Sequence, residues 1–352
     1  MDRDHSNDLI ARVQDAMQRR APLQIIGGDS KAFYGRPAQG EPLHVGAHRG
    51  ILNYEPTELV ITARAGTPLA DIERLLAEHG QMLPCEPPRF GATATLGGMV
   101  ATNLSGPRRP YAGAVRDGVL GVTLINGAGE RLRFGGEVMK NVAGYDVSRL
   151  QCGALGTLGV LLDVSLKVLP TPATELTLQR ECTAEGALVT MNEWAGRAYP
   201  LSAAAFDGDQ LYIRFSGSAS AVNAARKKFG GDEASEGNEF WSKLREHRHG
   251  FFSGDAPLWR VSVAPASPVL ALAGKNFLDW GGAQRWYRGD MTADDVRRVA
   301  RTAGGHAQLF RGGDRTCAFT PLGEGLIALH RRVKQAMDPH GIFNPGRLYA
   351  EL

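Results

Sequence analysis

The chain has 352 residues, of which 43% are hydrophobic and 22% charged, and its formal net charge is +3. This length accommodates two domains with separate cores, and the weak, scattered positive charge excludes an extended nucleic-acid-binding surface. No stretch approaches the roughly 20 apolar residues of a membrane helix, and the polar first twenty residues lack the pattern of a signal peptide. We therefore expect a cytoplasmic protein, with peripheral attachment to the inner membrane through partners left open.

The N-terminal part predicts a helix over 7–20, a short buried strand over 23–26, a strand over 58–64 and a helix over 68–79 that Gly80 ends. This order is typical of a β–α–β unit. Residues 91–121 are dense in glycine. Next, Asn126 and Gly127 predict a hairpin within 122–134, and residues 159–169 alternate as a long strand.

The segment "PTPATE" at 170–175 predicts a domain boundary. Beyond it we expect an antiparallel sheet covered by helices. The expected elements are a hairpin over 206–215, helices over 218–229, 237–248 and 292–303, strands near 258–264 and 306–311, and a last helix over 323–336. The predicted domains are residues 1–172, a second domain over 173–320, and a C-terminal helix and tail over 321–352 that returns to the first.

Two glycine-rich loops indicate an anion site. In the first loop, successive small residues can turn their N–H groups inward as a nest, although such a loop by itself is more often only a turn. In the second loop, a helix that begins at the glycine pair would direct its free N–H groups at the same anion. Two such loops suit a pyrophosphate. The residues are Gly27, Gly28, Asp29, Ser30 and Lys31 in the first loop, and Thr95, Gly97, Gly98, Thr102 and Asn103 in the second.

The two common phosphate signatures are absent. There is no GxxxxGK[ST] motif, and the glycines at 153, 156 and 159 lead into a strand, whereas a Rossmann fingerprint leads into a helix. We therefore expect a nucleotide cofactor outside a Rossmann fold.

Four segments in order resemble the vanillyl-alcohol-oxidase type (PCMH-type) of FAD-binding flavoproteins. They are "GGDSK" (27–31), "EPPRFGATATLGGMVATNLSGPRRPYAGAVRDGVLG" (86–121), "FGGEVMKNVAGYDVSRLQCGALGTLGV" (134–160) and "DPHGIFNPGRL" (338–348). Within that type, the chain is most similar to the FAD-binding subunits of bacterial glycolate oxidases (glycolate dehydrogenases). The resemblance implies an α+β fold with a two-lobed FAD-binding domain and an antiparallel-sheet cap domain covered by helices.

The resemblance also implies where FAD lies. The two loops would hold the pyrophosphate, Gly159 and Val160 would lie beside the adenine, and the 140–146 turn and Asn344 would lie toward the isoalloxazine ring. Relatives with covalently bound flavin carry a histidine just after the glycine pair. This chain has Asp29 there, so the FAD is expected to be noncovalent.

No catalytic residue is assigned. Catalytic relatives that oxidise 2-hydroxy acids carry a metal-binding His-x-Gly-Asp-Gly-Asn motif, which this chain lacks, and His306 and Asp314 have the wrong order and spacing. No metal is therefore expected. A structural role for Lys140 and Tyr145 is at least as plausible as a role in substrate binding. Arg285 and Arg288, near Trp286 and Tyr287, could bind a carboxylate from the cap domain, but we expect them on a surface strand.

The four cysteines, Cys85, Cys152, Cys182 and Cys317, have none of the spacings that hold an iron–sulfur cluster. With the resemblance, this indicates a flavoprotein subunit of a glycolate dehydrogenase complex. A paralogous FAD-containing catalytic subunit would oxidise glycolate, or D-lactate, to the 2-oxo acid, and an iron–sulfur subunit would carry the electrons onward. Two alternatives stay open: a self-sufficient FAD-dependent oxidoreductase for a 2-hydroxy acid or alditol, and a non-catalytic assembly subunit that retains FAD for folding.

Overall fold

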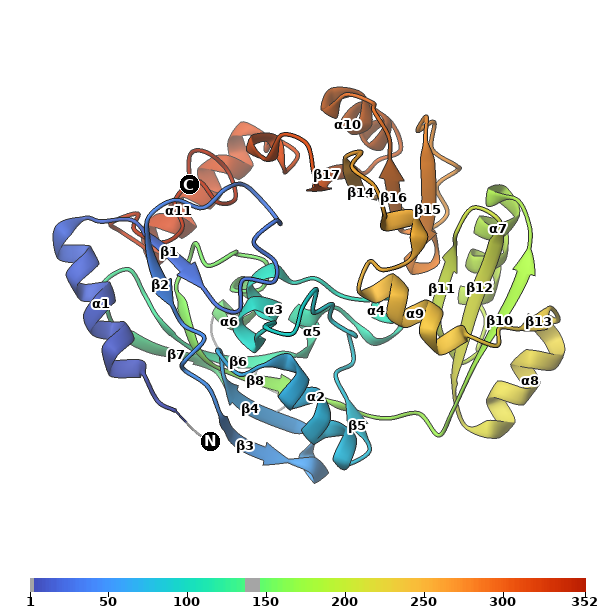
Figure 1. Ribbon diagram of the computed structural model, residues 1–352, viewed down its shortest axis with the longest axis horizontal. Helices are drawn as coiled ribbons and strands as arrows, with labels where there is room; N and C mark the ends of the chain where they lie inside the picture. Colours follow the sequence, from blue (N-terminus) through green and yellow to red (C-terminus); the bar gives the residue numbers. More distant parts are fainter. Residues whose placement is uncertain (1–2, 137–145) are drawn as a thin grey trace. The chain divides into compact units, whose positions relative to one another are not determined.

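The computed structural model describes residues 3–136 and 146–352 (Figure 1). The chain forms two compact units. Unit 1 comprises Met1–Leu104, Ala114–Thr171 and Pro321–Leu352, and unit 2 comprises Ser105–Gly113 and Pro172–Thr320. The C-terminal segment thus belongs to unit 1, although it follows all of unit 2 in the sequence.

A five-stranded antiparallel sheet with the order β3-β4-β8-β6-β7 is the frame of unit 1. One face of this sheet packs on α2 and α3, whose Ile72, Leu76 and Val100 share a core with Val122 and Val164 of the strands (Figure 1). The elements are β3 (Ile51–Glu55), β4 (Val60–Arg64), α2 (Leu69–Glu78), α3 (Leu96–Thr102), β6 (Val119–Ile125), β7 (Arg131–Gly135) and β8 (Val160–Lys167).

Smaller elements complete unit 1. The predicted N-terminal helix is α1 (Ser6–Arg19), which buries Leu9, Val13 and Ala16 in a core that also contains Phe343 of the tail. The short strand β1 (Leu23–Ile26) pairs in parallel with β2 (Glu41–His44), and β5 (Gln81–Met82) pairs antiparallel with β9 (Leu169–Pro170). The remaining helices of the unit are α5 (Val115–Gly118), α6 (Val147–Leu150) and α11 (Glu324–Met337), with the 3-10 helix η1 (Pro56–Glu58).

The prediction of a β–α–β unit at the N-terminus is wrong. The strand before α2 is β4, and the strand after it is β5, which pairs antiparallel with β9 and not with β4. A parallel crossover would need both strands in one sheet. The predicted hairpin does form between β6 and β7, over a loop in which Asn126 Oδ1 accepts the N–H groups of Ala128 and Glu130.

Unit 2 is built on one eight-stranded sheet with the order β13-β10-β12-β11-β15-β16-β14-β17, and each described pair is antiparallel. Helices α7 and α8 pack on the first half of the sheet through Trp194 and Phe229, and α10 packs on the second half through Val296 and Ala300. This confirms the predicted antiparallel sheet covered by helices.

The strands of unit 2 are β10 (Thr174–Glu181), β11 (Leu201–Phe206), β12 (Gln210–Gly217), β13 (Asp232–Glu233), β14 (Leu258–Ser262), β15 (Lys275–Asp279), β16 (Gln284–Arg288) and β17 (His306–Arg311). Its helices are α4 (Arg109–Ala112), α7 (Ala184–Ala195), α8 (Ala219–Phe229), α9 (Gly237–Arg245) and α10 (Ala293–Thr302), with the 3-10 helices η2 (Gly250–Phe252), η3 (Trp280–Gly282) and η4 (Arg315–Cys317).

Candidate cofactor site

The first predicted loop leaves β1 directly and lies against the segment that precedes α3. A Cβ atom on Gly28 would lie 1.5 Å from the carbonyl oxygen of Thr93, and one on Gly27 would lie 2.8 Å from Oγ1 of Thr95. The Thr93 hydroxyl also donates a hydrogen bond to the Gly28 carbonyl. The fold therefore brings the two predicted loops together, and no side chain fits at Gly28.

In the first loop, the carbonyl groups and the N–H groups differ in their hydrogen bonding. Three of the loop's carbonyl groups accept hydrogen bonds within the protein: that of Gly28 from the Thr93 hydroxyl, that of Asp29 from the Ala32 N–H at 3.1 Å, and that of Lys31 from the Tyr34 N–H at 3.0 Å. By contrast, the four consecutive N–H groups of residues 27–30 have no hydrogen-bond partner among the described residues. Such an array of donors is typical of an anion-binding nest.

Lys31 adds a positive charge to this loop. Its side chain is only 7% exposed, its ammonium group donates to the Arg89 carbonyl at 3.3 Å, and it lies 5.9 Å from the ring centroid of Phe90. A buried ammonium is stabilised by an anion close by. Together with the unused N–H groups, it fits a diphosphate.

The second loop contributes in another way. The predicted helix is α3, and the Thr95 hydroxyl caps it by accepting the Gly98 N–H at 3.2 Å. The Gly97 N–H donates to the Ala65 carbonyl at 2.7 Å, and a Cβ atom on Gly97 would lie 2.9 Å from the Cβ of Ala65. In this structure, the glycine pair therefore permits close packing of α3, and the unused N–H groups belong to the first loop.

Thr102 and Asn103 end the same helix. The Thr102 hydroxyl donates to the Gly98 carbonyl at 2.8 Å, and Asn103 has a φ of +51°. The side-chain carbonyl of Asn103 accepts the N–H of Arg116 at 3.1 Å. Both side chains thus use polar groups to fix the end of α3.

Asn344 ties β1 to the turn before β8. Its side chain is 4% exposed, its Oδ1 accepts the Ile25 N–H at 2.8 Å, and its Nδ2 donates to the Leu155 carbonyl at 2.7 Å. Gly159 and Val160 follow that turn, and Val160 is fully buried at the start of β8. The Asn344 amide is therefore engaged on both sides within the protein.

The 140–146 turn, with Lys140 and Tyr145, lies outside the described residues except for its last residue. That residue, Asp146, caps α6 by accepting the Arg149 N–H at 3.0 Å.

In unit 2, the expectation of a surface strand for Arg285 and Arg288 is wrong. They are 2% and 6% exposed, because β16 is paired on both sides, with β14 and β15. Arg285 donates to the carbonyl groups of Gly282 and Ser267, and burial lowers its pKa to about 10. Arg288 donates to the Phe252 carbonyl at 2.9 Å. Both arginines therefore stabilise neighbouring backbone segments of unit 2.

The described residues contain no group of three or more His, Cys, Asp or Glu side chains that could hold a metal ion. His306 lies on β17, and burial lowers its pKa. Asp314 instead caps η4 by accepting the Thr316 N–H at 2.9 Å. None of the helices in the described part of the chain is long and apolar enough to span a membrane.

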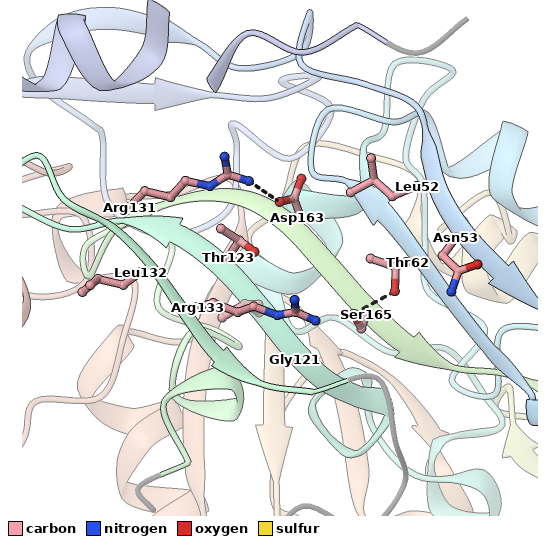
Figure 2. A pocket seen from close by; sticks show the side chains of 11 residues that line it. Leu52, Asn53, Thr62, Gly121, Thr123, Arg131, Leu132, Arg133, Asp163 and Ser165 are labelled. Carbon is pink, nitrogen blue, oxygen red and sulfur yellow. Dashed lines mark hydrogen bonds and ion pairs between the residues drawn. The ribbon is translucent and has the colours of Figure 1, made fainter. Parts of the chain in front are cut away.

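A separate groove of about 450 Å³ lies on the sheet of unit 1 (Figure 2). Thr62 and Ser165 line it, with their hydroxyl groups 2.8 Å apart, as do Asp163 and Arg131, which form an ion pair at 3.5 Å. These side chains alternate with core residues along their strands, so the groove is on the face opposite α2 and α3. No predicted cofactor residue lines it.

Sequence reasoning missed Thr93, which hydrogen-bonds to the first loop, and Arg347, which hydrogen-bonds to the residues that directly follow it. Arg347 is 313 positions from Tyr34, whose carbonyl it contacts. The only local signal was the proline- and glycine-rich tail around Arg347, which does not indicate what that side chain contacts.

Comparisons with known proteins agree with this geometry. The FAD binding domain family matches residues 4–135, and the C-terminal domain of FAD linked oxidases matches residues 318–348. The chain is 51% identical over 349 residues to the glycolate oxidase subunit GlcE of Escherichia coli (strain K12), covering 99% of each chain. It is 31% identical over 176 residues to the glycolate oxidase subunit GlcD of Bacillus subtilis (strain 168), covering 49% of this chain and 37% of that one.

Among solved structures, alkyldihydroxyacetonephosphate synthase superposes with a TM-score of 0.68 at 16% identity, covering 97% of this chain and 75% of that one. This likeness confirms the FAD-binding fold. The resemblance noted from the four sequence segments is thereby confirmed as well: the chain carries an FAD-binding domain and belongs to the family of the glycolate oxidase subunit GlcE.

Proposed function

We propose that this chain is the FAD-binding subunit of a multi-subunit glycolate oxidase that converts glycolate, or D-lactate, to the 2-oxo acid. Its partners are a paralogous FAD-containing catalytic subunit and an iron–sulfur subunit. The chain is cytoplasmic, and any peripheral attachment to the inner membrane would be through this complex. The main support is the full-length similarity to a glycolate oxidase subunit. The similarity to GlcD over half of the chain supports a paralogous partner.

The observation that supports the cofactor assignment is the nest of unused N–H groups at residues 27–30, beside the buried ammonium of Lys31. When bound, FAD supplies the two-electron acceptor for the oxidation. The N–H groups of residues 27–30 would bind the pyrophosphate oxygens, and Lys31 would balance their charge. Asn344 keeps β1, and with it the start of the loop, in place through Ile25.

The test is the visible spectrum of the purified chain under anaerobic conditions, before and after excess glycolate. A flavin spectrum that persists in the isolated chain and bleaches when the catalytic partner is added supports the proposal. Bleaching of the isolated chain favours the self-sufficient oxidoreductase. Absence of flavin, even after incubation with FAD, overturns the cofactor assignment.

A variant of Gly28 distinguishes the proposed function from the alternative of a non-catalytic assembly subunit. Gly28→Asp places a carboxylate beside the diphosphate and is expected to eject FAD from the folded chain by charge repulsion and steric conflict. If the complex with this FAD-free variant still turns over, the chain is an assembly subunit.

A further inference from the structure

We propose that the C-terminal tail, residues 344–347, is a clasp that holds the FAD phosphate loop in its binding conformation, with Arg347 as the positioning residue. The phosphate loop is here the first predicted loop together with residues 32–36. This inference rests on the proposed function, since it concerns the same site. It assigns the tail a role in cofactor affinity that is exerted through the loop.

The guanidinium of Arg347 donates hydrogen bonds to three carbonyl groups of the loop. Its Nη2 donates to Tyr34 at 2.7 Å and to Ala32 at 3.3 Å, and its Nη1 donates to Arg36. A planar guanidinium carries five N–H donors in a fixed arrangement, so it can orient several carbonyl groups at once. One side chain therefore binds three carbonyl groups within residues 32–36.

The loop also donates hydrogen bonds to the tail. Nε of Arg36 donates to the Gly346 carbonyl at 2.8 Å, and the Arg36 N–H donates to the Arg347 carbonyl at 3.2 Å. Asn344 fixes the other end of the clasp by its bonds to Ile25 and Leu155. The tail thus contacts the chain both just before the phosphate loop and at its end.

This arrangement determines which groups of the loop are available to a ligand. The Ala32 N–H donates to the Asp29 carbonyl at 3.1 Å, so the half held by Arg347 is tied to the half that presents the N–H groups. Asp29 has a φ of +56°, in the left-handed region that few non-glycine residues occupy, so the contacts of this loop help to hold its backbone there. Without the clasp, the loop would sample other conformations, and binding an anion would have to order it again.

The experiment measures the dissociation constants of FAD and of ADP for the full-length apoprotein by isothermal titration calorimetry. ADP is included because it carries the diphosphate without the flavin. Arg347→Met is expected to weaken both affinities about tenfold or more, because the loop must be ordered on binding. Arg347→Lys keeps the charge but cannot reproduce the fork, and about threefold weaker binding is expected.

Arg297→Met is the matched control. Arg297 is also half-buried and also holds loop carbonyl groups, those of Cys317 and Phe319, but it belongs to unit 2. Its removal should leave both affinities unchanged. An equal loss in Arg297→Met would overturn the clasp, because the effect would then be general destabilisation.

Wild-type affinity in Arg347→Met overturns the clasp alone and leaves the FAD assignment intact. If Arg347→Met does not fold, Arg347→Lys decides in the same way, and wild-type affinity in that variant contradicts the proposal. A wild-type chain that binds neither FAD nor ADP overturns the proposed function, and the clasp with it.

Discussion

The ammonium group of Lys334 lies 2.7 Å from Oδ2 of Asp338, and the two residues are 8% and 1% exposed. The same ammonium donates to the carbonyl groups of Thr157 and Phe343 at 2.7 Å each, and the carboxylate accepts the Phe343 N–H at 2.8 Å. The pair therefore joins the end of α11, the turn before β8 and the tail of unit 1.

Replacing Lys334 with Met should strongly destabilise unit 1. Burial lowers the pKa of Lys334 while the Asp338 charge opposes that shift, so each charge depends on the other. Removing one partner of a buried pair leaves the other uncompensated, at a cost of about 3–5 kcal/mol. Urea unfolding monitored by circular dichroism measures this difference.

The control is the exposed pair of Arg74 and Glu78, which has the same spacing on α2 and a distance of 3.0 Å. Arg74→Met should change the free energy of unfolding by less than about 0.5 kcal/mol, because water screens exposed pairs. Similar losses in the two variants would show that burial of the Lys334 pair does not matter.

Gly28→Ala should reduce FAD binding by steric conflict alone. The added methyl would lie 1.5 Å from the Thr93 carbonyl, so the loop must move away from the segment before α3. We expect affinity to fall about tenfold or more, measured as flavin absorbance per chain after gel filtration. Gly325→Ala is the comparison, since a Cβ there meets nothing within 4 Å and the residue is helical. That variant should keep its flavin; if both variants keep it, the contact at Gly28 is not required.

His247 should make unit 2 less stable at acidic pH. Burial of the ring, with further contributions from the positive charges of Arg311, Arg260 and Arg288, lowers the pKa of His247 well below the ordinary 6.5, and the ring stacks on Phe252 at a centroid distance of 4.0 Å. Below pH 6.5, His247 is protonated in the unfolded chain but not in the folded chain, so the free energy of unfolding decreases as the pH is lowered. The slope from this residue is at most about 1.4 kcal/mol per pH unit.

The variant His247→Phe preserves the stacking and removes the titration. Urea unfolding from about pH 7.5 down to about pH 5 should show a shallower loss of stability in the variant. His249 and His306, whose pKa values are also lowered by burial, remain in both proteins, so only the difference between the two slopes tests His247. Parallel slopes would contradict the assignment.

Cys317 should react with iodoacetamide before the other cysteines. It is exposed, whereas burial raises the pKa of Cys85 and of Cys152 to about 12 and so suppresses their thiolate forms. Mass spectrometry after brief alkylation should find one modified site, which Cys317→Ser removes. Early modification of Cys85 would show that unit 1 opens readily.

Local sequence signals located most of the elements. The helix predicted over 292–303 is α10, and the Thr292 hydroxyl caps it by accepting the Asp295 N–H at 3.2 Å. Periodicity and a capping hydroxyl are both local, so a short window contains them. The burial of β16 is different, because it depends on β14 and β15, which come from other parts of the chain.

Read from the chain alone, the order of four motifs was enough to identify the FAD-binding family, because such motifs are linear patterns of residues. Packing decides which backbone N–H groups are available to a cofactor. The Gly97 N–H donates to the Ala65 carbonyl, whereas the Gly28 N–H has no hydrogen-bond partner among the described residues. The same holds for Arg347, whose grip on Tyr34 joins opposite ends of the sequence. A donor is available only when no acceptor lies within about 3.5 Å, and that distance is set by the tertiary fold.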